Sequence, residues 1–262
     1  MSVPLLSATG ISKTYVSGGR RVVALDDTSI TLEPGRTLGL VGPSGSGKST
    51  LARILLRLIE PDAGRIVFDG IDLLALRGEA LRSVRRRIQM VFQDPLSAFN
   101  PRATVGGALA DPLRIHGMAS RAERPAAVAH LLERVGLDPT LATRGIREIS
   151  GGQRQRVAIA RAIATKPHLI VLDEAVSALD VSVRGKILDL LVGLQREQGI
   201  AYVFVSHDLA VVRAIAHTVA IMDAGRIVEQ GWTPEIVASP RSTTGKALVA
   251  AVPQLVLHGR HA

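Results

Sequence analysis

Apolar runs that end in polar or glycine residues recur along the chain and predict buried strands. Three of these runs cover residues 38–41, 168–172 and 201–205. After Thr50 the apolar positions follow the spacing of a helix. Continuous apolar runs are typical of parallel strands covered on both faces, and helices between them are typical of crossover connections. The pattern therefore predicts an α/β protein with a parallel sheet.

Weaker patterns predict the remaining elements. Residues 1–35 indicate short strands with turns at 17–19 and 34–35, and a further strand pair is expected to flank a turn at 62–64. Other expected elements are a strand at 86–92, an amphipathic helix at 122–135, a closing hairpin of 219–222 and 226–229, and a tail from about 231. Prolines and helical periodicity at 94–165 predict a helical insert within the sheet-forming core.

Composition limits the classes of protein that fit. Of 262 residues, 47% are hydrophobic and only 3% aromatic, so aliphatic side chains must form most of the core. The chain has no cysteine, which excludes disulfides, thiolate metal sites and a cysteine nucleophile. We see neither a signal peptide nor an uninterrupted apolar segment of the roughly 18 residues needed for a membrane span.

The net charge of +9 has three interpretations: nucleic-acid binding, attraction to an anionic membrane surface, and an arginine-rich composition without function. The densest basic run, residues 82–87, fits a solvated helix face. No basic stripe interleaves with aromatic residues, as a single-strand binder would require. Nucleic acid is therefore the least favoured partner, and none is expected.

Residues 42–50 read G-P-S-G-S-G-K-S-T and follow a predicted strand. A strand, a glycine-rich turn and a helix together form the setting of a phosphate-binding P-loop. Its backbone N–H groups and the helix N-terminus bind phosphate, its lysine reaches the β- and γ-phosphates, and its serine ligates Mg²⁺. The residues expected to bind ATP here are Gly42, Pro43, Ser44, Gly45, Ser46, Gly47, Lys48, Ser49 and Thr50.

Two carboxylates follow the apolar run at 168–172. At the end of such a strand, Asp173 could hold Mg²⁺ and Glu174 could polarise water. The alternative is that both acids only favour the N-terminus of the next helix. With a P-loop upstream in the same chain, the catalytic interpretation is preferred.

Three further positions are ambiguous when they are considered alone. Ser150, Gly151, Gly152 and Gln153 fit a helix capping box, but two glycines also expose backbone N–H groups to an anion. His207 follows a predicted strand, where a histidine is often packed or capping. Tyr15 lies in an N-terminal strand, where a tyrosine is usually part of the core.

Taken together, these motifs resemble those of the ATP-binding-cassette (ABC) ATPases. The ordered set is GPSGSGKST, Gln93, ISGGQ at 149–153, LIVLDEA at 169–175, SALD at 177–180 and His207. The resemblance covers nearly the whole chain, with Ile149 in place of the usual leucine. It implies a P-loop NTPase (RecA-like) core with an N-terminal antiparallel β subdomain at 1–93 and 166–231, an inserted α-helical subdomain at 94–165, and a tail at 232–262.

The same resemblance implies the site roles. Lys48, Gln93, Glu174 and His207 would act in catalysis, with Ser49, Gln93 and Asp173 around Mg²⁺ and Tyr15 on the adenine. The Ser150 turn of one subunit would close on the γ-phosphate held by its partner in a head-to-tail dimer, and Asp180 would support that contact.

Narrower motifs resemble the oligopeptide, dipeptide and nickel importer branch. They are QDPLSAFNPRATVG at 93–106, DEAVSALDVSV at 173–183 and the tail at 247–253. The short tail slightly favours nickel over peptide as cargo. The resemblance implies a second, different ABC ATPase subunit, two transmembrane permease subunits, an extracytoplasmic solute-binding protein, and a peripheral place on the cytoplasmic face of the inner membrane. The alternatives are a nonhydrolytic ATP-gated regulatory subunit and a nucleic-acid-remodelling ABC ATPase.

Overall fold

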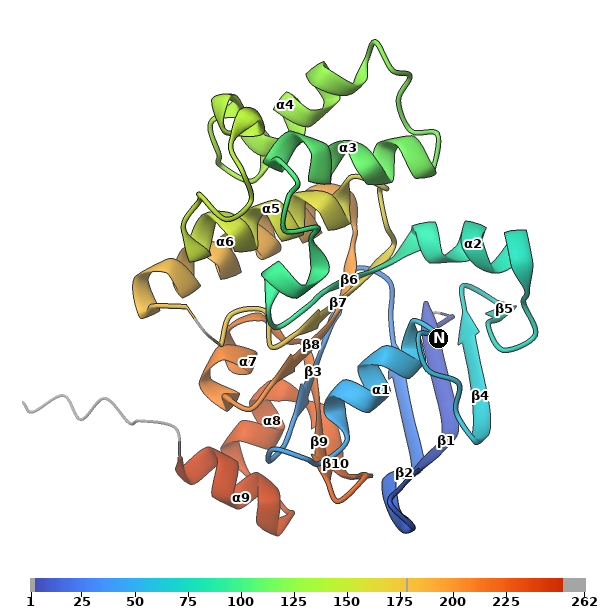
Figure 1. Cartoon of the computed structure of the whole chain (residues 1–262). Helices are drawn as coiled ribbons and strands as arrows, with labels where there is room; N and C mark the ends of the chain where they lie inside the picture. Colours follow the sequence, from blue (N-terminus) through green and yellow to red (C-terminus); the bar gives the residue numbers. More distant parts are fainter. Residues whose placement is uncertain (1–2, 178, 252–262) are drawn as a thin grey trace, which may run out of the picture.

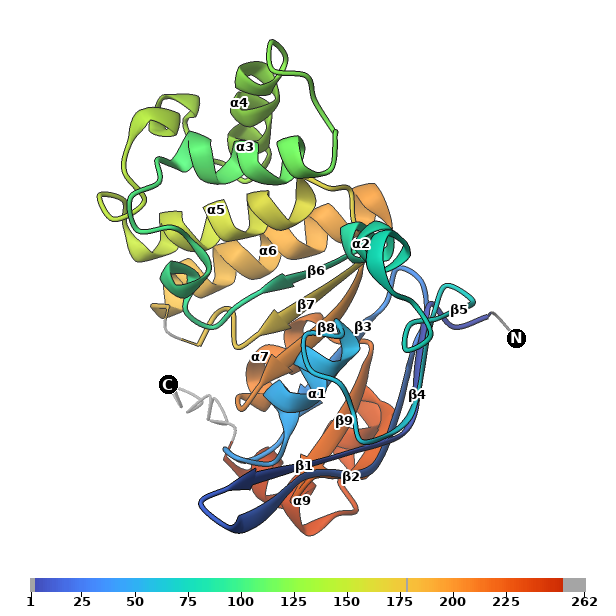
Figure 2. The ribbon, with the colours of Figure 1, turned by 45° about the vertical axis from the view of Figure 1, so that its right-hand side comes forward.

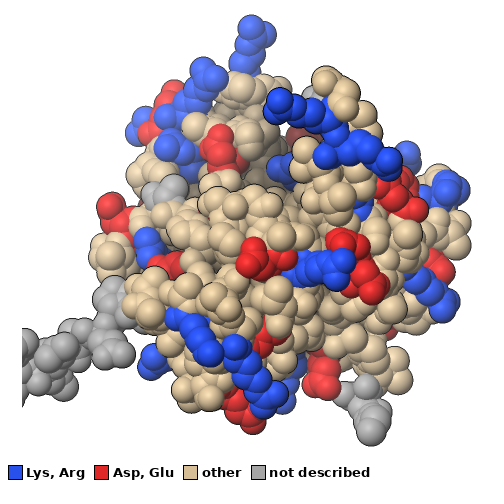
Figure 3. Space-filling model, turned by 90° about the horizontal axis from the view of Figure 1, so that it is seen from below, with Lys and Arg blue, Asp and Glu red and all other residues tan. Residues whose placement is uncertain are grey.

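Two β-sheets and the helices packed around the larger one make up the fold (Figure 1, Figure 2). The computed structural model describes residues 3–177 and 179–251. Within these two ranges, no helix combines the length and the apolar character that crossing a bilayer requires. On the face seen in Figure 3, basic and acidic side chains are interspersed.

The larger sheet has the spatial order β10-β9-β3-β8-β7-β6 among the described residues. All neighbouring pairs in it are parallel except β9 and β10. Its strands are β3 (Thr37–Val41), β6 (Ile88–Val91), β7 (Leu169–Asp173), β8 (Ala201–Ser206), β9 (Thr218–Asp223) and β10 (Arg226–Trp232). Every residue of β3, β7 and β8 is buried, which explains their continuous apolar sequences.

The smaller sheet is antiparallel and has the order β2-β1-β4-β5. Its strands are β1 (Leu6–Ser17), β2 (Arg20–Leu32), β4 (Ala63–Phe68) and β5 (Ile71–Asp72). Two expectations for this region are wrong. The N-terminal strands are long rather than short, and residues 62–64 are not a hairpin turn, because β4 pairs with β1, more than 45 residues earlier in the chain.

Helices cover both faces of the larger sheet. On one face α1 (Lys48–Leu55) packs between it and β2 of the smaller sheet. The other face is covered by α5 (Gly151–Ile163), α6 (Val181–Gln198) and α7 (Leu209–Ile215). The remaining helices are α2 (Gly78–Arg87), α3 (Val105–Ile115), α4 (Arg124–Arg134), α8 (Thr233–Ala238) and α9 (Thr243–Ala250), with short 3-10 helices η1 (Pro95–Ala98) and η2 (Pro139–Thr143).

Two other boundaries differ from the sequence expectation. The strand expected at 86–92 begins only at Ile88, because Arg86 and Arg87 complete α2. The tail expected from about 231 contains α8 and α9, and residues 252–262 lie outside the described part of the chain. The helix at 122–135 and the hairpin through 223–225 agree with α4 and with β9 and β10.

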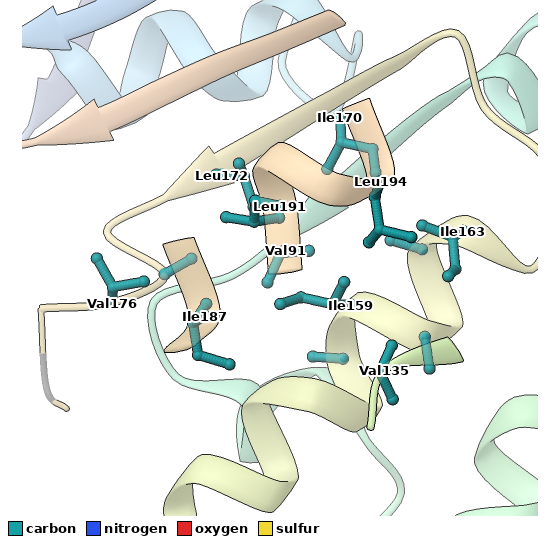
Figure 4. Close-up of a cluster of buried hydrophobic side chains, with 14 of the residues drawn as sticks. Val91, Val135, Ile159, Ile163, Ile170, Leu172, Val176, Ile187, Leu191 and Leu194 are labelled. Carbon is teal, nitrogen blue, oxygen red and sulfur yellow. The ribbon is translucent and has the colours of Figure 1, made fainter. Parts of the chain in front are cut away.

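Residues 94–165 hold η1, α3, α4, η2 and α5, and α3, α4 and α5 lie in the upper part of Figure 1. Their apolar side chains continue into the core of the sheet. In the buried cluster of Figure 4, Ile159 of α5 lies with Val91 of β6, Ile170 of β7 and Ile187 of α6. Residues of the expected insert at 94–165 and of the expected core at 1–93 and 166–231 thus share one apolar cluster. The division of the chain into these two domains stays a prediction.

Ile187→Ala should lower the free energy of unfolding by about 2–5 kcal/mol, because it leaves a cavity in this shared cluster. The side chain of Ile187 is fully buried, whereas Ile115 is 58% exposed and serves as the matched control. Ile115→Ala should change the free energy of unfolding by no more than about 0.5 kcal/mol. Urea unfolding of both variants measures the difference, and equal losses would contradict the assignment of Ile187 to the core.

Candidate functional site

The loop between β3 and α1 has a shape that requires glycine. Gly47 has a φ of 103° and precedes the first residue of α1. A Cβ atom on Gly47 would lie 2.4 Å from the backbone oxygen of Ala24, and one on Gly42 would lie 2.1 Å from that of Met222. Both distances are far shorter than any real contact. The loop therefore wraps closely against two neighbouring strands, with its N–H groups at the start of a helix.

Lys48 is buried inside this loop. Its Nζ donates to the backbone oxygens of Gly42 at 2.9 Å and Pro43 at 2.7 Å, and to Ser46 Oγ at 3.3 Å. Burial lowers the pKa of Lys48, while the nearby Glu174 and Asp173 carboxylates act in the opposite direction. The ammonium group is thus partly desolvated and held where a phosphate oxygen could replace the loop carbonyls.

Asp173 is the last residue of β7 and is only 4% exposed. Its Oδ1 accepts a hydrogen bond from Ser49 Oγ at 3.0 Å. Burial raises the pKa of Asp173, against the lowering effects of Ser49, Arg53 and Lys48. A hydroxyl and a carboxylate at this spacing are hard oxygen donors, which suit Mg²⁺ held jointly with substrate phosphates. Among the described residues no cluster of three or more acids and histidines forms a cation site made by protein alone.

Glu174 lies between two other polar side chains at the same edge of the sheet. Gln93 Nε2 donates to Glu174 Oε2 at 2.9 Å, and His207 Nδ1 lies 3.5 Å from Glu174 Oε1. The backbone of Glu174 has a φ of 48°, in the left-handed region that most residues avoid. Its N–H donates to the backbone oxygen of Val205 at 3.1 Å, which fixes this conformation against β8.

Most of these groups line one open cavity of about 480 Å³; Asp173 does not line it itself but contacts it through Ser49. Gln93, Glu174 and His207 form one part of its wall, and the P-loop forms another. The remaining lining residues from outside these motifs are Val22, Val23 and Ala24 of β2. The sequence analysis did not identify these three residues as part of the site. Their only signal is in the structure, where Val22 and Val23 are apolar strand residues that remain more than half exposed.

Tyr15 lies beside this cavity. It pairs with Val22 across β1 and β2, and the residue is 38% exposed. Lys13 Nζ lies 5.8 Å from the centre of the ring. Tyr15 is absent from the described lining residues, so its expected contact with adenine depends on how the nucleotide extends past Val22.

The Ser150 turn lies elsewhere. Ser150 caps α5: Gln153 N donates to Ser150 Oγ at 3.2 Å, and Ser150 N donates to Gln153 Oε1 at 2.8 Å. The structure thus forms the capping box, and Gly151 and Gly152 occupy the first turn of the helix. In the part of the chain that is described, neither this turn nor the exposed Asp180 lines the P-loop cavity. One copy of the chain therefore leaves these groups facing outward.

Comparisons with known proteins agree with this geometry. The family described as "ABC transporter" matches residues 25–177. The chain is 53% identical over 260 residues to the probable peptide ABC transporter ATP-binding protein y4tS of Sinorhizobium fredii, covering 97% of the chain and 74% of that protein. It is 52% identical over 234 residues to the glutathione import ATP-binding protein GsiA of Escherichia coli K12, covering 89% of the chain but only 38% of that protein.

Two solved structures share the fold. The dimeric post-hydrolysis structure of the ATP-binding cassette MJ0796 bound to ADP and Pi matches with a TM-score of 0.80 and 32% identity, over 87% of this chain and 98% of that one. The structure of cbiO1 from Clostridium perfringens, part of the ABC transporter complex cbiONQ, matches with a TM-score of 0.79 and 28% identity, over 91% and 92%.

Asp173→Asn should raise the melting temperature of the nucleotide-free protein at neutral pH. Because burial raises the pKa of Asp173, keeping its carboxyl ionised opposes folding at any pH above that raised value. The gain should shrink as the pH falls through the raised pKa and vanish below the ordinary value of 3.8, where wild-type Asp173 is neutral. Thermal unfolding over a pH series measures this. Asp189→Asn, on the exposed part of α6, controls for the loss of one carboxylate, and an equal rise in both variants would contradict the explanation.

Proposed function

This chain belongs to the ABC transporter family as one of its ATPase domains, and from that premise we propose that it hydrolyses ATP to power an importer. It is an ATP hydrolase with a P-loop NTPase fold. The observation that carries the proposal is the placement of Glu174 between Gln93 and His207, opposite the P-loop in one cavity. That arrangement supplies both a phosphate-binding loop and a base beside it.

ATP binding uses groups that are already in place. Lys48 exchanges its bonds to Gly42 and Pro43 for bonds to the β- and γ-phosphates, and the N–H groups of the loop bind the same oxygens. Ser49, Gln93 and Asp173 would hold Mg²⁺, which when bound would neutralise charge on the phosphates. The close fit between Ser49 Oγ and Asp173 Oδ1 supports this assignment.

Glu174 is the proposed base. Its carboxylate orients or deprotonates water for in-line attack on the γ-phosphate. Gln93 positions the carboxylate by a hydrogen bond, and His207, whose Nδ1 lies 3.5 Å from the carboxylate, would position the phosphate. Charge on the transferred group is stabilised by Lys48 and by backbone N–H groups that are fixed before the reaction begins.

We infer that a second ATPase subunit completes the site. The Ser150 turn presents Gly151 and Gly152 at the N-terminus of α5, which suits an anion, yet it lies outside the chain's own ATP cavity. A head-to-tail dimer would bring this turn onto the γ-phosphate held by the partner, with Asp180 beside it. A different chain as partner, giving a heterodimer, follows from the importer branch that the motifs resemble.

The permease contact is proposed at a groove beside Gln93. A hollow of about 210 Å³ is lined by residues of α2, β6, η1 and α5 and of the segments that follow α1 and η1, among them Leu58, Phe99 and Arg161. Leu58 is 50% exposed there, although it is large and apolar. Because Gln93 and η1 join this groove to the ATP cavity, a segment of a transmembrane permease seated here would sense nucleotide state. Two permeases, an extracytoplasmic solute-binding protein and a peripheral place on the cytoplasmic face of the inner membrane complete the proposal.

Peptide is the proposed cargo. One relative is named for peptide transport and the other for glutathione import, and both substrates contain peptide bonds. The slight preference for nickel rests on the short tail; these names do not support it, and residues 252–262 of the tail lie outside the described part of the chain.

Glu174→Gln should lower ATP turnover by about 100-fold or more while ATP binding persists, since it removes the base but keeps the shape of the side chain. The measurement is phosphate release from the chain assembled with its partners, together with nucleotide binding. Glu133→Gln, an exposed substitution on α4, is the control. Undiminished turnover in Glu174→Gln would contradict the role of Glu174. Absence of turnover in the wild-type complex would instead favour the nonhydrolytic regulatory subunit, and turnover that requires DNA or RNA would favour the nucleic-acid-remodelling ATPase.

Leu58→Asp should weaken association with the permeases, because it replaces an exposed apolar side chain of the groove with a charged one. Nucleotide binding by the chain should stay the same, since Leu58 lies outside the ATP cavity. Co-purification with the permeases measures the effect. Ile115→Asp is the matched control, because Ile115 is similarly exposed and does not line the groove. Equal co-purification of both variants and the wild type would argue against this docking site.

A further inference from the structure

Arg184 joins two loops of the ATP site from a position outside the cavity. It lies in the first turn of α6, and its side chain is 26% exposed. Its Nη1 donates to Asp208 Oδ2 at 3.3 Å, and its Nη2 donates to the backbone oxygen of Leu179 at 3.3 Å. A planar guanidinium can hold two acceptors in a fixed relative geometry, which a single ammonium group cannot do.

The first of these partners, Asp208, makes hydrogen bonds that hold the turn carrying His207. Asp208 follows His207 directly, and its Oδ1 caps α7 by accepting from the N–H groups of Ala210 at 2.9 Å and Val211 at 3.4 Å. Its own N–H donates to Ser206 Oγ at 3.0 Å. With Oδ1 engaged by the helix, Oδ2 accepts from Arg184 and so links the position of this turn to α6.

The second partner belongs to the loop that starts at Glu174. Ser177 closes the start of this loop, because its N–H and its hydroxyl donate to the Glu174 backbone oxygen at 3.1 Å and 2.8 Å. Leu179 stands directly before Asp180, the first residue past the loop and the N-cap of α6. Arg184 therefore holds the end of the loop where Asp180 faces outward.

One donor of Arg184 has no acceptor in the described structure. Its Nε is buried and unpartnered among residues 3–177 and 179–251. Buried polar atoms without a partner are rare in folded proteins. The unused N–H gives the guanidinium a third position for a loop carbonyl if Leu179 and Asp180 shift.

We propose that Arg184 is a positioning residue that links the placement of His207 to the Asp180 loop. The proposal rests on the proposed function, in which Asp180 contacts the partner ATPase. A shift of that loop on contact moves the Leu179 carbonyl, the guanidinium follows it, and Asp208 carries the movement to His207 beside Glu174. Closure of the facing subunit would thereby change the position of His207 in this ATP site.

Replacing Arg184 with methionine tests this link in the chain assembled with its partner ATPase. Arg184→Met should lower kcat for ATP by about 10-fold or more, because His207 loses its alignment. The KM for ATP should stay within about twofold, since the P-loop is untouched. Any sigmoidal dependence of the rate on ATP concentration should flatten toward a Hill coefficient of about 1. Arg184→Lys should recover part of kcat, because it restores charge at one of the two partners.

A double-mutant cycle separates positioning from loss of structure. Asp208→Asn keeps an oxygen to cap α7 but removes the charge opposite Arg184, so it should lower kcat to a similar extent. Combining it with Arg184→Met should lower kcat little further, since both changes break the same link. Losses of kcat that multiply in the double variant would overturn the proposal.

Arg134→Met is the matched control. Arg134 also pairs with an α6 residue, Glu197, at 2.9 Å, and is 24% exposed, but it touches neither loop. Its kcat should equal that of the wild type. A wild-type complex with normal turnover and an equally active Arg184→Met variant would overturn this inference alone. A wild-type complex without turnover would instead count against the proposed function.

Discussion

The whole ATP site depends on one constraint: neighbouring parallel strands end at the same edge of the larger sheet. Val41 pairs with Ser206, Asp173 with Val205, and Val91 with Leu172. The residues that follow these positions are therefore brought within reach of one another although more than 160 positions separate Gly42 from His207. No side chain of the site needs a long loop to reach it, and the buried apolar strands hold the geometry rigid.

Burying opposite charges at this edge gives the site its electrostatic character. Lys48 and Asp173 are both shifted by desolvation toward their neutral forms, the lysine downward in pKa and the aspartate upward. Within residues 3–177 and 179–251, neither group forms an ion pair; each is held by neutral oxygens, from the P-loop backbone for Lys48 and from Ser49 for Asp173. A ligand that carries both phosphate charge and a divalent cation would satisfy the two groups together, which favours binding of the complex over either component alone.

Local pattern was sufficient for the α/β class, which followed from the continuous apolar runs. The same runs predicted that Gly42 to Thr50, Asp173 and Glu174 follow buried strands, as the structure shows, whereas the roles of these residues in binding and catalysis stay predictions. The pairing of β4 with β1 could not be predicted, because antiparallel partners distant in sequence leave no local signal. Val22 to Ala24 were missed for a similar reason, since the cavity reaches them only after the smaller sheet folds against α1. The Ser150 turn shows a third limit: its local capping box is complete, so nothing within one chain reveals what its outer face binds.

The left-handed backbone of Glu174 also restricts how this ATPase can change over evolutionary time. Glycine, asparagine and aspartate adopt such a conformation readily, whereas valine, isoleucine and threonine are strained there. After a gene duplication, a copy released from selection for turnover can therefore exchange Glu174, the proposed base, for one of the three tolerant residues without straining this backbone position. An active ATPase could in this way give rise to a paralogue that binds nucleotide without hydrolysing it. The backbone conformation limits which residues could replace Glu174 in such a paralogue.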